Sequence, residues 1–289
     1  MKIRIGYELV YNCPLDTSMI LMLHAQPGGG QRMLIPDRLS SLPSLPLTNY
    51  RDGYGNLCTR IEAPAGTVCL TADGVFEDTG LPEPAFLNAP ETPISDLPHE
   101  ALMCLLPSRY CESDLMGAEA FGLFGHLTPG WPRVQSICDF VNRHVVFGYQ
   151  YARPTKSALE TFRERHGVCR DMAHLAIAFC RAMNIPARYV TSYLGDIGVP
   201  ATDSPMDFAG SIEVFLGGAW HSFDPRNNAR RIGRMVIARG RDAADVAIST
   251  TFGQADLQKF RVWTDEISDA AFADLLQQRR IGCPAAQAA

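Results

Sequence analysis

Cys169 is the residue of this chain whose position best suits covalent chemistry. It lies in the stretch GVCRDMAHLAIAFCRAMNIPAR, residues 167–188, after a glycine that ends one helix pattern and in the first turn of the next. The unpaired backbone N–H groups and the positive end of a helix favour a thiolate there and could stabilise an oxyanion. We interpret Cys169 either as a nucleophile or as a small apolar side chain that packs at a helix start.

Helical patterns surround this cysteine. Apolar spacing predicts a helix over residues 131–145, and the capping-box pair Ser157 and Glu160 opens another that ends near Gly167. The helix that begins at Cys169 is apolar on almost every side, which predicts that it is buried. Residues 187–195 then predict a strand, and residues 210–225 predict a strand pair joined by a two-residue glycine turn.

The first hundred residues predict a different architecture. Four apolar runs separated by glycine- and proline-rich turns are typical of strands. The five prolines between residues 82 and 98 exclude a regular helix or a central strand. We therefore predict a β-sandwich-like domain over residues 1–100 with a Pro-rich linker to about residue 115, a core over 116–265, and a C-terminal tail over 266–289.

The segments around Cys169 and Asp224 resemble the two core blocks of the transglutaminase-like superfamily. GVCRDMAHLAIAFCRAMNIPARYVTSYLG resembles the nucleophile segment of that family, and IEVFLGGAWHSFDPRNN resembles its strand, turn and Asp-Pro block. YRDGYGN and IARGRDAADVAI are similar to segments before and after the core in bacterial members. The resemblance implies an α+β fold: a papain-like core, with helices packed on an antiparallel sheet, preceded by a small all-β domain. It also implies that Cys169 is the nucleophile and Asp224 the orienting carboxylate.

The histidine that this family uses as a base is missing from its expected position. Family members have His-Ala-Trp near the start of this strand, where gap-free alignment places Ala209, Gly210 and Ser211. Alternation along the strand pair puts five residues on one face: Ala209, Ser211, Glu213, Ser222 and Asp224. The sequence therefore predicts that Cys169 and Asp224 face each other across a cleft with no base between them.

Other polar residues near the two blocks have more than one interpretation. Arg170 is either solvated or substrate-facing, and Ser211, Glu213 and Ser222 are candidate site-lining residues. His174 is also a candidate, but it points about 140° around the helix from Cys169, so we expect it to make a structural hydrogen bond.

Two functions are consistent with these features. The first is a cysteine acyl-transferase or amide hydrolase that acts on peptide or amide-bearing substrates through a thioester at Cys169. The second is a binding or scaffold protein that keeps the fold without the chemistry, because losing a general acid–base costs about 10²–10⁴-fold in rate. We predict no cofactor and no metal, since the cysteines and histidines lack the spacing of metal ligands.

Composition argues against several other classes of protein. The chain has 289 residues, a formal charge of −5 and nine cysteines without paired spacing. These values argue against nucleic acid and membranes as partners and against a disulfide scaffold. The first residues alternate like a strand and lack the apolar core of a signal peptide, so we expect a cytoplasmic protein. No feature predicts the oligomeric state.

Overall fold

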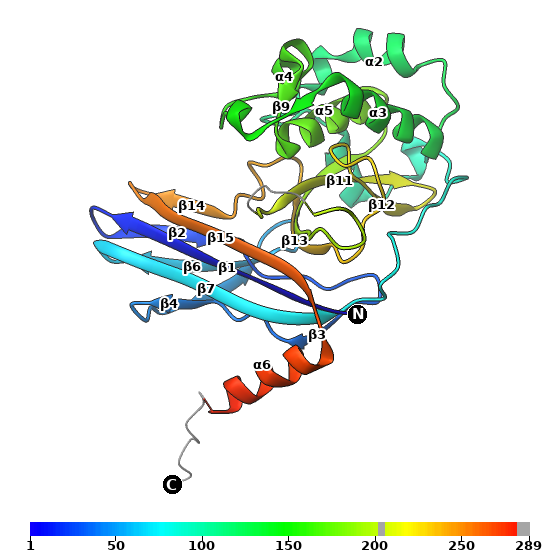
Figure 1. The fold of residues 1–289 in the computed structure, drawn as a ribbon. Helices are drawn as coiled ribbons and strands as arrows, with labels where there is room; N and C mark the ends of the chain where they lie inside the picture. Colours follow the sequence, from blue (N-terminus) through cyan, green and yellow to red (C-terminus); the bar gives the residue numbers. More distant parts are fainter. Residues whose placement is uncertain (202–205, 282–289) are drawn as a thin grey trace.

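Two antiparallel sheets form one end of the molecule in the computed structural model, which describes residues 1–201 and 206–281 (Figure 1). The first sheet consists of β1 (Lys2–Cys13), β3 (Arg32–Ile35), β4 (Ser40–Leu42), β7 (Gly66–Glu77) and β15 (Asp256–Ile267). Its strand order is β15-β1-β7-β3, and β4 also pairs with β7. The second sheet consists of β2 (Thr17–Leu21), β5 (Thr48–Arg51), β6 (Leu57–Ala63) and β14 (Ser249–Phe252), in the order β14-β2-β6-β5.

Alternating apolar residues hold the two sheets together. Ile3, Ile5 and Leu9 of β1 are fully buried, whereas Arg4 and Glu8 of the same strand are partly exposed. They belong to the same apolar cluster as Met19 of β2 and Ile61 of β6. Burying this surface stabilises the pair of sheets by roughly 25 cal/mol per Å². The strand-rich N-terminal region predicted from the alternation is thus confirmed.

The last strands return to these N-terminal sheets. β14 pairs with β2, and β15 pairs with β1 along almost its whole length. The sequence prediction placed this segment in the core up to residue 265, so the structure differs from that boundary. The reason lies in the exposure of β15, whose first six residues are all solvent-exposed and give no alternating signal. The predicted tail begins inside β15 and continues as helix α6 (Asp269–Ile281).

A largely extended segment connects the sheets to the second half of the molecule. It contains only short helical turns: η1 (Ile94–Asp96), α1 (His99–Leu102), η2 (Met103–Leu105) and η3 (Ser113–Leu115). Its prolines agree with this lack of regular structure. The Pro90 carbonyl accepts a hydrogen bond of 2.8 Å from the Gly217 N–H, and Glu91 forms an isolated β-bridge with Leu216. The connection is therefore fastened to the strand pair that follows it in sequence.

Helices cover a third antiparallel sheet in the second half (Figure 1). The sheet consists of β10 (Ala187–Tyr193), β11 (Ala209–Leu216), β12 (Ala219–Phe223) and β13 (Met235–Gly240), in the order β12-β11-β10-β13. The helices are α2 (Gly117–Phe124), α3 (Trp131–His144), α4 (Ala158–Glu164) and α5 (Cys169–Ala182). The turn η4 (Tyr149–Tyr151) and the parallel pair β8 (Val146–Phe147) and β9 (His166–Gly167) complete this half.

Helix α5 is the centre of this half. Eleven of its fourteen residues are buried, and it packs on β10, β11 and the helices α3 and α4. The capping box at the start of α4 is present: the Glu160 carboxylate accepts from the Ser157 N–H at 2.9 Å. The predicted α+β class, with helices packed on an antiparallel sheet, is confirmed. Among the helices of the described residues, none has the length and apolar character to cross a membrane.

Gly6 offers a test of the return of β15 to the first sheet. The Trp263 indole of β15 lies over Gly6 and donates a hydrogen bond to Asp73 on β7. A Cβ on residue 6 would overlap that indole and the Ala72 carbonyl oxygen. We expect Gly6→Ala to lower the free energy of unfolding in urea by about 1–3 kcal/mol.

Gly53→Ala is the matched control for this substitution. A Cβ at Gly53 meets no atom within 4 Å, and the residue does not have a positive φ. Its free energy of unfolding should change by less than about 0.5 kcal/mol. Equal effects of the two substitutions would contradict the close packing of β15 on β1.

Candidate active site

The hairpin of β11 and β12 has the register that the sequence predicts. Leu216 pairs with Ala219, and the ladder continues without a shift to the end of β12. Gly217 and Gly218 have φ values of 56° and 84°, and a two-residue turn of this kind needs a positive φ at both positions. The residues that alternation placed on one face therefore belong to one face of the sheet.

Cys169 is the first residue of α5 and is held there by the turn before it. The buried Asp171 carboxylate accepts a hydrogen bond of 3.0 Å from the Val168 N–H. A Cβ on Gly167 would lie only 2.8 Å from Asp171 Oδ2, so this approach of the chain requires glycine. Asp171 thus satisfies a backbone donor at the helix start and fixes the position of Cys169.

Cys169 lines two adjacent cavities. The narrow cavity has a volume of about 110 Å³, and the wide cavity has a volume of about 480 Å³. Both are also lined by Asp207, Ala209 and Tyr149, and Arg226 and Asn227 belong to the narrow cavity. Most other walls of the wide cavity are apolar or aromatic: Tyr110, Tyr189, Phe208, Val246 and Ile248. Cys169 and Ala209, where the sequence analysis expects the family's histidine, therefore line the same site.

The surroundings of Cys169 favour the thiol over the thiolate. Burial is the largest effect and raises the pKa of Cys169, and the nearby Asp207 and Asp224 carboxylates raise it further. A hydrogen bond from the Gly210 N–H and the Arg226 cation lower the pKa without reversing the net shift. Desolvation therefore outweighs the effect of the helix end, which by itself favours a thiolate.

Asp224 lies at the end of β12 and is charged although it is only 6% exposed. Burial raises the pKa of Asp224, but the Arg234 cation and hydrogen bonds from Asn227 outweigh burial and hold the pKa below its ordinary value. Arg234 Nη2 lies 2.8 Å from Asp224 Oδ2. Asn227 donates to both carboxylate oxygens, from its backbone N at 2.9 Å and from Nδ2 at 2.8 Å.

Arg234 is a residue that the sequence did not single out. Its guanidinium is 4% exposed and also binds Glu83 Oε1 at 2.7 Å, in the segment that leaves the first sheet. It donates to Ser192 Oγ, at 3.4 Å, and Ser192 pairs with Ala209 across β10 and β11. Arg234 therefore supplies the charged partner of Asp224 that an imidazole would supply in a Cys-His-Asp site.

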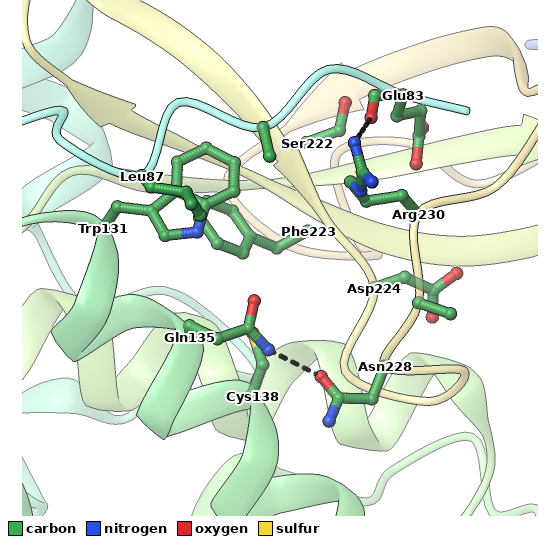
Figure 2. A pocket seen from close by; sticks show the side chains of 12 residues that line it. Glu83, Leu87, Trp131, Gln135, Cys138, Ser222, Phe223, Asp224, Asn228 and Arg230 are labelled. Carbon is green, nitrogen blue, oxygen red and sulfur yellow. Dashed lines mark hydrogen bonds between the residues drawn. The ribbon is translucent and has the colours of Figure 1, made fainter. Parts of the chain in front are cut away.

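Asn227 connects the surroundings of Asp224 with those of Cys169. Asp224 lines a third cavity, which has a volume of about 280 Å³. Figure 2 shows Asp224 beside Asn228 in this cavity, and Arg230 pointing toward Glu83. Asn227 binds Asp224 and lines the narrow cavity that contains Cys169. The residue between their surroundings is thus an amide, and the absence of a base there stays a prediction.

The other residues predicted on the helix have separate places. Arg170 lines the wide cavity, but its guanidinium is bound to the Arg153 carbonyl at 2.6 Å. His174 is fully buried between the rings of Tyr110 and Tyr189, and its Nε2 accepts from the Ala243 N–H at 3.1 Å. Burial lowers the pKa of His174 well below its ordinary value. The hydrogen bond of His174 is the structural one that the sequence predicts.

The residues predicted on the strand pair do not gather around Cys169. Ser211 is buried opposite Val190 in the sheet. Glu213 binds Arg188 and Arg239 at 2.6 and 2.9 Å. Glu213 and Ser222 line a further cavity between the sheets and the hairpin, of about 320 Å³, which does not include Cys169. Register places them on the face of Asp224, but none of Ser211, Glu213 and Ser222 lines a cavity with Cys169.

Gly210, the residue after Ala209, has no room for a side chain. A Cβ at this position would overlap Tyr189 Oη and approach Arg170 Cα to 3.4 Å. An alanine at residue 210 therefore cannot fit unless Tyr189 moves. Tyr189 itself lines the wide cavity beside Cys169.

The structure also shows charged residues that the sequence analysis missed. Asp207 precedes Ala209 by two positions, and Arg226 follows Asp224 by two. Both act electrostatically on Cys169, and the Arg226 guanidinium lies 3.9 Å from the centre of the Phe147 ring. Both residues are close in sequence to predicted site residues, but no sequence pattern indicated that their side chains lie near Cys169. Within residues 1–201 and 206–281, no group of three or more His, Cys, Asp or Glu could hold a metal ion.

Comparison with known proteins gives matches over most of the chain. Residues 122–225 match the family model of the transglutaminase-like superfamily. The crystal structure of a “putative cysteine protease” from Cytophaga hutchinsonii is 30% identical, with a TM-score of 0.80 over 93% of this chain and 91% of that one. An uncharacterized protein of Mycobacterium leprae is 26% identical over 84% of this chain and 88% of its own length. One of Mycobacterium tuberculosis is 29% identical over 68% of each.

The raised pKa of Cys169 predicts how fast the sulfur reacts. We expect its alkylation by iodoacetamide to be slow at pH 7 and to keep accelerating above pH 8.5, about the ordinary thiol value. The rate is measured by mass spectrometry of the peptide that contains residue 169. Arg226→Met removes a cation that lowers this pKa, so it should slow the reaction at pH 8. A rate plateau that begins below about pH 7.5 would contradict the raised pKa.

The ion pair of Asp224 and Arg234 predicts a pH-dependent loss of stability. Arg234→Gln leaves a buried carboxylate uncompensated and should lower the free energy of unfolding at pH 7 by about 3–5 kcal/mol. In the wild-type protein the lowered pKa of Asp224 means that the pair stabilises above the unfolded value near 3.9, and that this stabilisation is lost as pH falls through the folded value. In the variant the pKa rises instead, so the deficit should shrink from pH 7 to pH 5.

Two further variants control this measurement. Arg32→Gln breaks an exposed ion pair with Glu77 and should cost no more than about 1 kcal/mol. Adding Asp224→Asn to Arg234→Gln removes the unpaired charge and should recover part of the stability. If the double variant were no more stable than Arg234→Gln, the charge of Asp224 would not be the cause.

Proposed function

The chain belongs to the transglutaminase-like superfamily, as its two sequence blocks predict, and from this premise we propose that it is a cysteine-dependent amide-bond enzyme. In this proposal Cys169 attacks the carbonyl carbon of a peptide or amide-bearing substrate and forms a thioester. An amine or water then takes the acyl group, so the enzyme is an acyl-transferase or an amide hydrolase. No cofactor takes part in the proposed reaction.

The observation that carries this proposal is the placement of the sulfur. Cys169 is the first residue of a long buried helix and lines two cavities, so a substrate carbonyl can reach it. The hydrogen bond from the Gly210 N–H and the Arg226 cation supply positive charge near the reacting atoms. The wide cavity, with its aromatic and aliphatic walls, suits the side chain of a peptide substrate.

The missing histidine changes how the thiol would be activated. Ala209 presents only a methyl group to the cavities, and the partner of Asp224 is Arg234. Since the pKa of Cys169 is raised, little thiolate is present at neutral pH. Attack by the sulfur therefore needs a base that takes the proton during the reaction.

The raised pKa of Cys169 also fits a second function. A protein that keeps the fold but has lost the base would bind peptides or act as a scaffold without turnover. The raised pKa of Cys169 and the saturated carboxylate of Asp224 favour this alternative. The two functions differ in one result, since only the enzyme forms a covalent acyl group on Cys169 that Cys169→Ser abolishes.

Placing a histidine at residue 209 tests the aligned position. Ala209→His would put an imidazole in the two cavities that Cys169 lines. We expect hydrolysis of p-nitrophenyl esters and peptide anilides to rise by about 10²-fold, the lower end for a general base, because Arg234 still occupies Asp224. The measurement is the steady-state rate of release of the chromophore.

The control is the double variant Ala209→His with Cys169→Ser, which should lose the gain. Ala209→Ser, which adds a polar group without a base, should leave the rate near that of the wild type. A folded Ala209→His variant with no gain in rate would contradict the proposed alignment of Ala209 with the family's base.

A further inference from the structure

Asp207 is the carboxylate that shares both cavities with the sulfur of Cys169. It lies two residues before the start of β11 and lines the narrow and the wide cavity together with Cys169 and Ala209. The Phe208 N–H donates a hydrogen bond of 2.6 Å to Asp207 Oδ1, which fixes the carboxylate at the entrance of the strand. Asp207 is thus an acidic side chain placed close to the position from which the histidine is missing.

The histidines closest to Cys169 in the core do not compete for this place. Nε2 of His174 is bound to the Ala243 N–H, and the ring is enclosed by two tyrosines. His221 Nε2 is bound to the Leu216 carbonyl at 3.0 Å, at the far end of the hairpin. His166 lies against Tyr151 and Lys156 at the end of α4. None of these three rings lines either cavity, and each has a structural partner.

The electrostatic links of Asp207 point to the same cluster. The Asp207 charge acts on Cys169, Tyr149 and Tyr189, and Arg226 acts on both Asp207 and Cys169. Arg226 is anchored over the Phe147 ring, so its cation stays beside the sulfur and the carboxylate. The remaining charged residues of the narrow cavity are Asp196 and Arg231, which lie 3.5 Å apart.

The environment of Asp207 suits proton transfer. Burial raises the pKa of Asp207, while the Phe208 N–H and the Arg226 cation lower it without reversing the shift. A carboxylate with a raised pKa accepts a proton more readily than an ordinary one, and the acid that results can return it.

We propose that the Asp207 carboxylate is the general base and acid of Cys169, in place of the histidine that the chain lacks. This inference rests on the proposed function. As the Sγ–C bond forms, the thiol proton moves to Asp207 and the carbonyl electron pair moves to oxygen. When the oxyanion collapses, the C–N bond breaks and the Asp207 proton goes to the leaving amine, which leaves a thioester.

The second half of the reaction reverses the roles. The Asp207 carboxylate takes a proton from the attacking water or amine as the new bond to the carbonyl carbon forms. On collapse the Sγ–C bond breaks, and the proton returns from Asp207 to the sulfur. The Arg226 cation lies where it can compensate the negative charge on the sulfur or the carbonyl oxygen in both halves.

Asp207→Asn separates this role from a purely electrostatic one because two rates should change in opposite directions. Loss of the negative charge lowers the pKa of Cys169, so alkylation by iodoacetamide at pH 8 should become faster. Loss of the base should slow acylation of Cys169 by a peptide anilide by about 10²-fold or more. Acylation is measured as single-turnover release of the aniline, with the acyl group located on Cys169 by mass spectrometry.

Two variants accompany this test. Asp207→Glu keeps the carboxyl group and should retain more acylation activity than Asp207→Asn. Asp274→Asn removes a carboxylate from an exposed position on α6 and should change neither rate. Thermal unfolding of each variant verifies that it is folded.

The outcomes distinguish the two proposals. If Asp207→Asn acylates as fast as the wild type or faster, Asp207 is not the base, and the proposed function stands. If the wild-type protein forms no acyl group on Cys169 with any peptide anilide or p-nitrophenyl ester, the proposed function fails and the role of Asp207 fails with it. Slower acylation together with faster alkylation supports the general-base role.

Discussion

A buried carboxylate keeps its charge only where a cation and hydrogen-bond donors replace the water that it has lost. Asp224 meets this requirement through Arg234 and Asn227. Because Arg234 also binds Glu83, one guanidinium joins the end of the hairpin to the connection that comes from the first sheet. The place of the hairpin, and with it the place of Ala209 beside Cys169, depends on this charge balance.

The same balance shows why the site differs from a Cys-His-Asp arrangement in more than one residue. With Arg234 on the carboxylate, an imidazole would no longer be the partner that Asp224 needs. Next to Ala209, residue 210 is a glycine, and Tyr189 fills the space that a side chain there would need. The surroundings of Asp224 and of Gly210 thus both have their space and charge filled by other residues. Asp207 and Arg226 are the charged residues of the narrow cavity that also act on the pKa of Cys169.

Local features of the fold could be predicted from the sequence, whereas features that need distant partners could not. The capping box at Ser157, the glycine turn of the hairpin and the burial of the Cys169 helix depend on neighbouring residues, and their patterns identified them. The pairing of Arg234 with Asp224 and Glu83 depends on how distant segments meet in the fold, and the spacing of residues in the sequence does not predict it. The raised pKa of Cys169 likewise comes from burial by segments far apart in sequence.

The pairing of β1 with β15 has a consequence for how the protein is made. β1 lies between β7 and β15, so one of its two hydrogen-bonded neighbours is synthesised long after β1 itself. Until then the nascent chain carries an unpaired strand edge, which other chains can join. Contacts of such wide sequence separation also slow folding. A chain that lacks β15 would therefore expose this edge of β1 to other chains.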